Sequence, residues 1–141
     1  MSLERFILSA ASIPHQMQRY NTAGDWNYAE GGELIVSVSN CSAFDSSTNV
    51  AQNTENLLVV HEIIEAMICQ ARGITEASVT QWDLDHIDHP DPGSIPGCPY
   101  YREHMFAELI ERAIAAELDV DWDTHEAIIE NLCSTGDSNG I

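Results

Sequence analysis

Alternation of apolar and polar side chains marks one strand and one helix clearly. Residues 33–39 alternate with a period of two and are rich in β-branched side chains, which predicts a strand. Residues 54–72 carry apolar side chains at helical spacing, with Asn53 or Thr54 available as the N-cap and Gly73 after the last turn. Because its apolar face is wide, this helix is expected to be buried against another element.

Weaker patterns complete the expected fold. Residues 100–118 predict a second long helix, and residues 124–132 a third that opens with Asp123 and Glu126 in a capping-box arrangement. The order predicts an α+β fold in which the two long helices pack on a small sheet that includes residues 33–39. The other predicted segments are a helix over 3–13 ended by Pro14, a turn-rich stretch over 21–32, a polar loop over 42–53, a short strand or turn over 74–82, and a loop rich in proline and glycine over 83–99.

Length and composition fit one domain. The chain has 141 residues, of which 44% are hydrophobic, and a domain of this size buries about two thirds of the surface that its unfolded form exposes. The sequence has no repeat, no linker, no apolar run long enough for a membrane span and no signal-peptide pattern. A single cytoplasmic domain over residues 1–141 is therefore predicted, with its four scattered cysteines interpreted as buried thiols.

Charge narrows the set of partners. The chain has 23 acidic residues against five basic ones, all arginines, and a formal net charge of −18. Nucleic acids and anionic membranes are bound largely through lysine and arginine, so neither is expected as a partner. The composition favours a small-molecule or peptide substrate that is neutral or cationic, or a metal ion held among carboxylates.

The candidate chemistry lies within the helix over residues 54–72. His61, Glu62 and Glu65 form an H-E-x-x-E motif. Residues four apart share one face of a helix, so His61 and Glu65 can approach a single metal ion while Glu62 stands beside it. A zinc hydrolase needs such an arrangement, in which two ligands hold zinc or another divalent transition metal and Glu62 takes a proton from the activated water.

A third ligand has to come from elsewhere in the chain. His104 is preferred, because it lies on the helix over residues 100–118, which can pack antiparallel to the motif helix. Glu108 of the same helix is a second candidate. The remaining candidates lie in the intervening loop and are Asp83, Asp85, His86, Asp88 and His89.

The same motif has an interpretation without a metal. His61, Glu65 and His104 can form a buried hydrogen-bond network that joins two helices. The other histidines carry no partner pattern, and His15 and His125 are predicted to lie at the surface. A metal site and an internal network therefore stay open as alternatives at this point.

The strand over residues 33–39, followed by a helix with His61 and Glu62, resembles the core of zincin-like metalloproteases. This resemblance implies an edge strand beside the active-site helix and a zinc-dependent hydrolase of peptidase type. It also implies His61 as a ligand and Glu62 as the general base, with Glu65 in place of the second histidine of that family. A carboxylate ligand is harder than an imidazole and can change the preferred metal.

A second resemblance covers most of the chain beyond residue 20. Residues 57–74, the aspartate-rich loop and residues 99–111 are similar to a group of small phage and environmental bacterial proteins with no established activity. This resemblance leaves open a non-catalytic metal-binding or interaction protein of phage or environmental origin. Closed coordination by four protein ligands would favour that function, whereas an open position would favour catalysis.

A third resemblance concerns the glutamates alone. Glu62 with Glu65, and Glu108 with Glu111, resemble the E-x-x-E pairs with which all-α NTP pyrophosphohydrolases bind magnesium. The predicted strand and the scarcity of basic side chains for phosphate contacts speak against this function.

Overall fold

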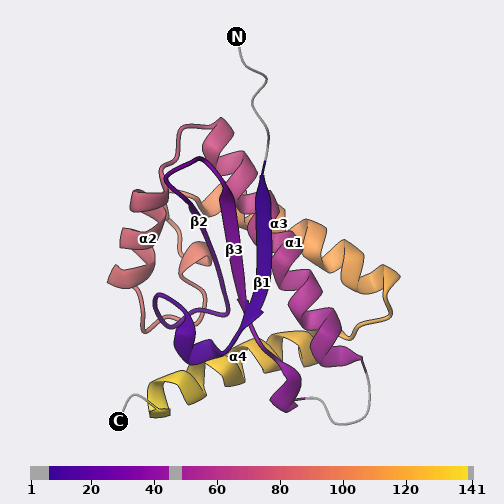
Figure 1. The fold of residues 1–141 in the computed structure, drawn as a ribbon. Coiled ribbons are helices and arrows are strands. Elements are labelled where there is room, and N and C mark those ends of the chain that lie inside the picture. Colours follow the sequence, from indigo (N-terminus) through magenta and orange to yellow (C-terminus); the bar gives the residue numbers. More distant parts are fainter. Residues whose placement is uncertain (1–6, 45–48, 140–141) are drawn as a thin grey trace.

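The described residues form a three-stranded sheet and four α-helices (Figure 1). The computed structural model describes residues 7–44 and 49–139. The predicted α+β class is confirmed. In chain order the elements are β1 (Leu8–Ile13), β2 (Gly24–Tyr28), β3 (Leu34–Ser39), α1 (Val50–Ala71), α2 (Glu76–Asp85), α3 (Tyr101–Glu117) and α4 (Trp122–Asn139).

The sheet is built around β3, which pairs in parallel with β1 and antiparallel with β2. The strand predicted over residues 33–39 is confirmed, and Leu34, Val36 and Val38 are fully buried on one of its faces. The edge position that the zincin resemblance implied for this strand is wrong. Both sides of β3 carry strand partners, so β3 is central and β2 is the edge strand that contacts α1.

The two outer strands, β1 and β2, form in segments for which the sequence predicts a helix and a turn-rich stretch. The helix expected over residues 3–13 is wrong where the structure describes it, because residues 8–13 form β1; residues 1–6 lie outside the described part. The side chains of residues 9–12 in β1 are small and exposed and give it no apolar helical face to bury, and pairing with β3 decides its conformation. The turn-rich stretch over 21–32 contains β2, whose Trp26 is buried in the core.

Both long helices of the prediction are confirmed, but the expected packing of both on the sheet is wrong for α3, which packs on α1. α1 lies between the sheet and α3 (Figure 1) and begins at Val50, within the stretch predicted as a loop. α3 runs antiparallel to α1, since His61 contacts Glu111 whereas Arg72 contacts Glu103. This antiparallel pairing is the arrangement that the sequence required to bring His104 toward the motif.

The strand or turn predicted over residues 74–82 is wrong, because this stretch forms most of α2. The Thr75 side chain caps α2 by accepting a hydrogen bond from the Ser78 backbone N–H. β-branched Val79 and Thr80 favour a strand locally, but Val79 packs into the core from the helix. α2 also takes the first residues of the predicted loop, up to Asp85.

α4 is longer than predicted and begins earlier. It starts at Trp122, and the Asp121 side chain accepts from the backbone N–H and the hydroxyl of Thr124. The cap is therefore Asp121, and the capping role assigned to Asp123 is wrong. α4 crosses one end of the α1 and α3 pair (Figure 1), which positions its buried residues next to the motif helix.

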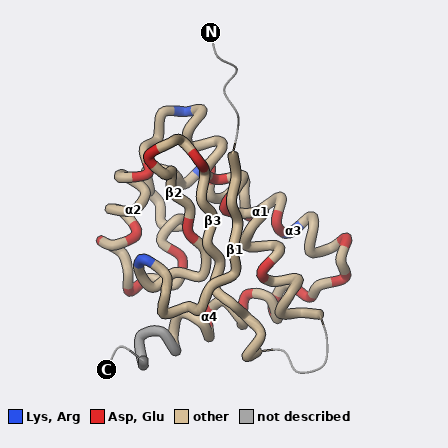
Figure 2. Tube along the Cα trace, in the orientation of Figure 1, with Lys and Arg blue, Asp and Glu red and all other residues tan. Residues whose placement is uncertain are grey.

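The distribution of charged residues and the burial of the cysteines agree with what the composition indicates. Acidic residues lie along the helices and in the loops, with few basic residues between them (Figure 2). Cys41, Cys69 and Cys98 are buried free thiols, as predicted, whereas Cys133 is half-buried. Of the helices in the described part, none combines the length and the apolar character that crossing a membrane requires.

Replacement of Leu57 by alanine tests the packing of α1. Leu57 is fully buried, so Leu57→Ala should lower the free energy of unfolding by about 2–5 kcal/mol. Met67 lies on the same helix but is 51% exposed, and Met67→Ala should cost less than about 1 kcal/mol. Urea unfolding of both variants measures the difference, and equal losses would contradict the placement of the two faces of α1.

Candidate metal centre

Side chains of α1 and α3 converge on one point. Glu65 Oε2 lies 3.2 Å from His61 Nε2 and 2.8 Å from His104 Nδ1, and the two ring nitrogens are 3.1 Å apart. His61 and Glu65 are buried, and the side chain of His104 is 13% exposed. The structure thus brings together the three residues that the sequence selected as ligands, while metal binding itself stays a prediction.

The size of this triangle matches the space around a small metal ion. Ligand atoms about 2.0–2.1 Å from a tetrahedral zinc ion lie about 3.3 Å from one another. The three observed separations are 2.8, 3.1 and 3.2 Å, so shifts of a few tenths of an ångström would admit the ion. Two nitrogen donors and one carboxylate oxygen form a ligand set typical of catalytic zinc.

Outer contacts determine which ring atoms face the triangle. His61 Nδ1 donates to Glu111 Oε1 at 2.8 Å, and His104 Nε2 donates to Asp91 Oδ1 at 2.9 Å. In the neutral rings the lone pairs then lie on His61 Nε2 and His104 Nδ1, both directed at Glu65 Oε2. A carboxylate behind each histidine is the usual arrangement around metal-bound imidazoles.

The remaining oxygen of Glu65 is also fixed. Trp26 Nε1 donates a buried hydrogen bond of 3.0 Å to Glu65 Oε1, and this contact joins the edge strand β2 to α1. Glu65 therefore presents Oε2 alone to the two histidines. Neither Trp26 nor Asp91 has a sequence signal as a partner of the site, because no helical or strand spacing links them to residues 61–65.

Three electron-pair donors at this separation require a positive charge between them. Burial alone would lower the pKa of His104, but hydrogen bonds to Asp91 and Glu65 raise it to about 10. Burial alone would likewise raise the pKa of Glu65, but hydrogen bonds from His104 and His61 hold it below its ordinary range. Without a metal the cluster therefore retains protons, and a divalent cation satisfies the same requirement.

Glu62 stands next to the triangle in an unusual environment. It is 7% exposed, and its Oε2 has no hydrogen-bond partner within the described part of the chain. Burial, followed by the charge of Glu65, raises the pKa of Glu62 well above its usual range. The backbone of β2 passes close by, since a Cβ atom on Gly24 would lie 2.7 Å from Glu62 Oε1. A buried carboxylate with a raised pKa is suited to general-base work near neutral pH.

Helix α4 also contributes to the centre, through a histidine that contacts α1 and α3. His125 of α4 is fully buried, and its Nε2 lies 2.5 Å from Glu111 Oε2 while its Nδ1 lies 3.0 Å from Thr54 Oγ1. The surface position predicted for His125 is wrong, because α4 packs this ring against α1 and α3. His15 is also not a free surface residue, since its ring bonds Ser39 and Asn21.

The other ligand candidates do not join the triangle. Glu108 lines the same cleft, with Arg112 as its ionic neighbour at 3.6 Å. Asp83 accepts hydrogen bonds from the hydroxyls of Tyr20 and Tyr100, and the His86 ring stacks on Trp82. Within the described residues, Asp85, Asp88 and His89 belong to no ligand cluster either.

The triangle forms the floor of a cleft of about 680 Å³. Its walls come from residues 20–24, from residues 87–93 and from α4. The loop of residues 87–93 lies tightly over the floor, since a Cβ atom on Gly93 would be 2.5 Å from His104 Cγ. The cleft leaves space for a substrate above Glu62 and His104.

Comparison with protein-family models, with curated protein sequences and with solved structures gives no match to this chain. The arrangement of the site is therefore the basis for assigning a function.

Asp91→Asn tests the outer contacts of the centre. An amide holds the His104 ring more weakly than a carboxylate does, so zinc affinity should fall about 10–100-fold. Asp85→Asn is the matched control, because Asp85 is exposed at the end of α2 and outside the cleft. Competition with a chromogenic chelator measures both affinities. Equal affinity in the Asp91→Asn variant and the wild type would contradict the role assigned to Asp91.

Proposed function

We propose that this protein is a metal-dependent hydrolase, with zinc as the preferred ion and a peptide bond as the bond that is cleaved. The convergence of His61 Nε2, Glu65 Oε2 and His104 Nδ1 within 3.2 Å, each residue oriented by a further contact, is the observation that carries this proposal.

The donor set suits a catalytic ion. His61, Glu65 and His104 would supply three protein ligands, the number typical of catalytic zinc sites, in which water or substrate takes the fourth position. A divalent ion held there supplies Lewis acidity and lowers the pKa of a coordinated water to near neutrality. The carboxylates of Glu111 and Asp91 keep both rings in the tautomers that binding requires.

Glu62 is the proton acceptor in this proposal. Glu62 lines the cleft next to Glu65, and its Oε2 has no hydrogen-bond partner within the described residues, so this oxygen is available to a water that would attack the substrate. Glu62 takes one proton from that water as the oxygen bonds to the peptide carbonyl carbon. As the carbon–nitrogen bond breaks, the same proton passes to the leaving amine, so one water molecule is consumed for each bond cleaved.

The pyrophosphohydrolase alternative receives less support. In that function Glu111 would share a magnesium ion with Glu62 and Glu65. Its two carboxylate oxygens are instead occupied by the rings of His61 and His125. Carboxylates committed to imidazoles are poor candidates for binding magnesium against a triphosphate.

Replacing Glu62 tests catalysis apart from binding. Glu62→Gln keeps the shape of the side chain but removes the proton acceptor, so hydrolysis of a peptide substrate should fall at least about 100-fold. Zinc content and thermal stability should stay at wild-type levels, because Glu62 is not a ligand. Glu108→Gln is the control, because Glu108 also lines the cleft but has no role in catalysis, and this variant should retain hydrolysis.

The assay uses quenched fluorescent peptide pools with zinc-loaded protein. Full activity in the Glu62→Gln variant would contradict the role of Glu62. Stoichiometric zinc in a wild-type protein that cleaves no pool would favour the non-catalytic metal-binding function.

A further inference from the structure

The cleft above the metal centre is strongly and unevenly charged. Its lining comprises 27 residues, about a fifth of the chain, yet it holds nine of the 23 acidic residues. None of the four arginines that the structure describes is among them. The acidic residues come from α1, α2, α3, α4 and the loop between α2 and α3, so the cleft is negative on its floor and on two walls. The lining acidic residues are Glu62, Glu65, Asp83, Asp88, Asp91, Glu108, Glu111, Glu126 and Glu130.

A bound metal ion does not neutralise this cleft. A divalent cation offsets two negative charges, those of Glu65 and Glu62. Arg112 lies 3.6 Å from Glu108 and 3.8 Å from Glu126, so one positive charge is shared between these two carboxylates. Asp88 and Glu130 are exposed and line the cleft from two different segments, with no basic residue within ion-pair distance in the described part. Excess negative charge therefore remains around any bound substrate.

A second observation points to a ligand in the same place. Glu62, which lines the cleft, is more than nine-tenths buried, and its Oε2 has no hydrogen-bond partner in the described residues. A buried, unpaired carboxylate oxygen is costly unless a bound molecule satisfies it. The charge and the unpaired oxygen together require an occupant that brings hydrogen-bond donors and positive charge.

We infer that the substrate carries a basic group, an ammonium or a guanidinium, close to the bond that is cleaved. This inference rests on the proposed hydrolase function and narrows its substrate to basic peptides. Asp88 and Glu130 attract the basic group from the two walls, while the peptide carbonyl lies over the His61, Glu65 and His104 triangle. Clefts lined by one sign of charge concentrate ligands of the opposite sign and can raise association rates about 10- to 1,000-fold. Phosphate esters, nucleotides and acidic peptides are disfavoured by the same field.

The test compares three pools of quenched fluorescent octapeptides that differ only in one fixed central residue, arginine, glutamine or glutamate. Cleavage by the zinc-loaded wild type is measured as kcat/KM. Binding is measured separately, by fluorescence anisotropy on the zinc-loaded Glu62→Gln variant. The arginine pool should exceed the glutamate pool at least about tenfold in both assays at about 0.01 M ionic strength, and less so at about 0.3 M.

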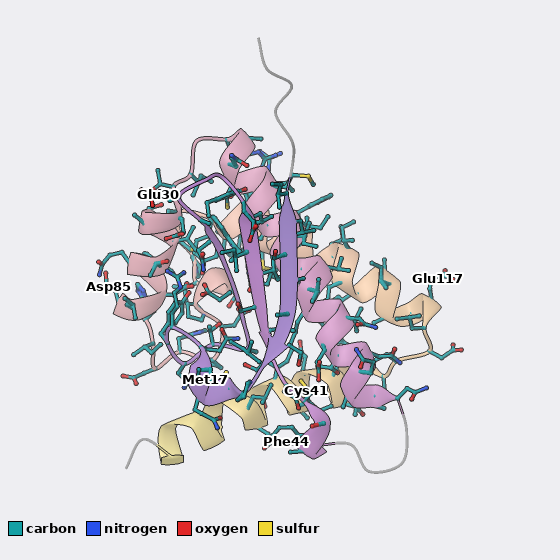
Figure 3. All side chains as sticks on the ribbon, in the orientation of Figure 1. Met17, Glu30, Cys41, Phe44, Asp85 and Glu117 are labelled. Carbon is teal, nitrogen blue, oxygen red and sulfur yellow. The ribbon has the colours of Figure 1, made fainter. Side chains whose placement is uncertain are left out.

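Matched double variants distinguish the effect of charges that line the cleft from the effect of the protein's net charge. Asp88→Asn with Glu130→Gln should reduce the preference for arginine about threefold or more. Glu30→Gln with Glu117→Gln removes the same charge from two exposed positions outside the cleft, which point outward in Figure 3, and should leave the preference unchanged.

Each outcome bears on one claim. Equal cleavage of all pools, or an equal effect of the two double variants, would overturn the basic-substrate inference while the hydrolase function stands. Selective binding of the arginine pool without cleavage of any pool would support the basic ligand and contradict the hydrolase function.

Discussion

The fold depends on a buried cluster of donor atoms from two helices, which needs a proton or a metal ion among them. Two imidazole nitrogens and a carboxylate oxygen converge within 3.2 Å in a buried site. In a medium of low dielectric constant such a triangle is unfavourable unless a proton or a metal ion lies among the three atoms. The raised pKa of His104 and the lowered pKa of Glu65 show that a proton on His104 is strongly favoured beside the Glu65 carboxylate. A divalent ion meets it with stronger and more directional bonds.

The secondary structure is arranged around this triangle. α1 supplies His61 and Glu65 one turn apart, and antiparallel α3 brings His104 against them. The sheet contributes through Trp26 of β2, whose indole fixes Glu65. α4 contributes His125, which anchors Glu111. Polar atoms of β2, α1, α3 and α4 that would be costly to bury separately therefore hydrogen-bond one another in one network.

The sequence could predict those features that depend on the spacing of residues within one segment, but not those that depend on contacts between distant segments. The spacing of His61 and Glu65 follows from helix geometry, and alternation around Val36 identifies β3, so both were accessible. β1 was not, because its conformation comes from pairing with β3 and not from its own side chains. Asp91 and His125 were missed for a related reason. Their roles arise where a loop and α4 meet α3, and no spacing in the sequence encodes those contacts.

X-ray absorption at the metal edge, on protein loaded with one equivalent of zinc, tests the centre most directly. Zinc bound at this centre should show nitrogen and oxygen ligands at about 2.0–2.1 Å, with outer-shell scattering from two imidazole rings that falls to one ring in the His104→Ala variant. Sulfur ligands at about 2.3 Å would assign the metal to the cysteines and contradict this centre. The centre would equally be contradicted by a spectrum of freely hydrated zinc, without imidazole scattering.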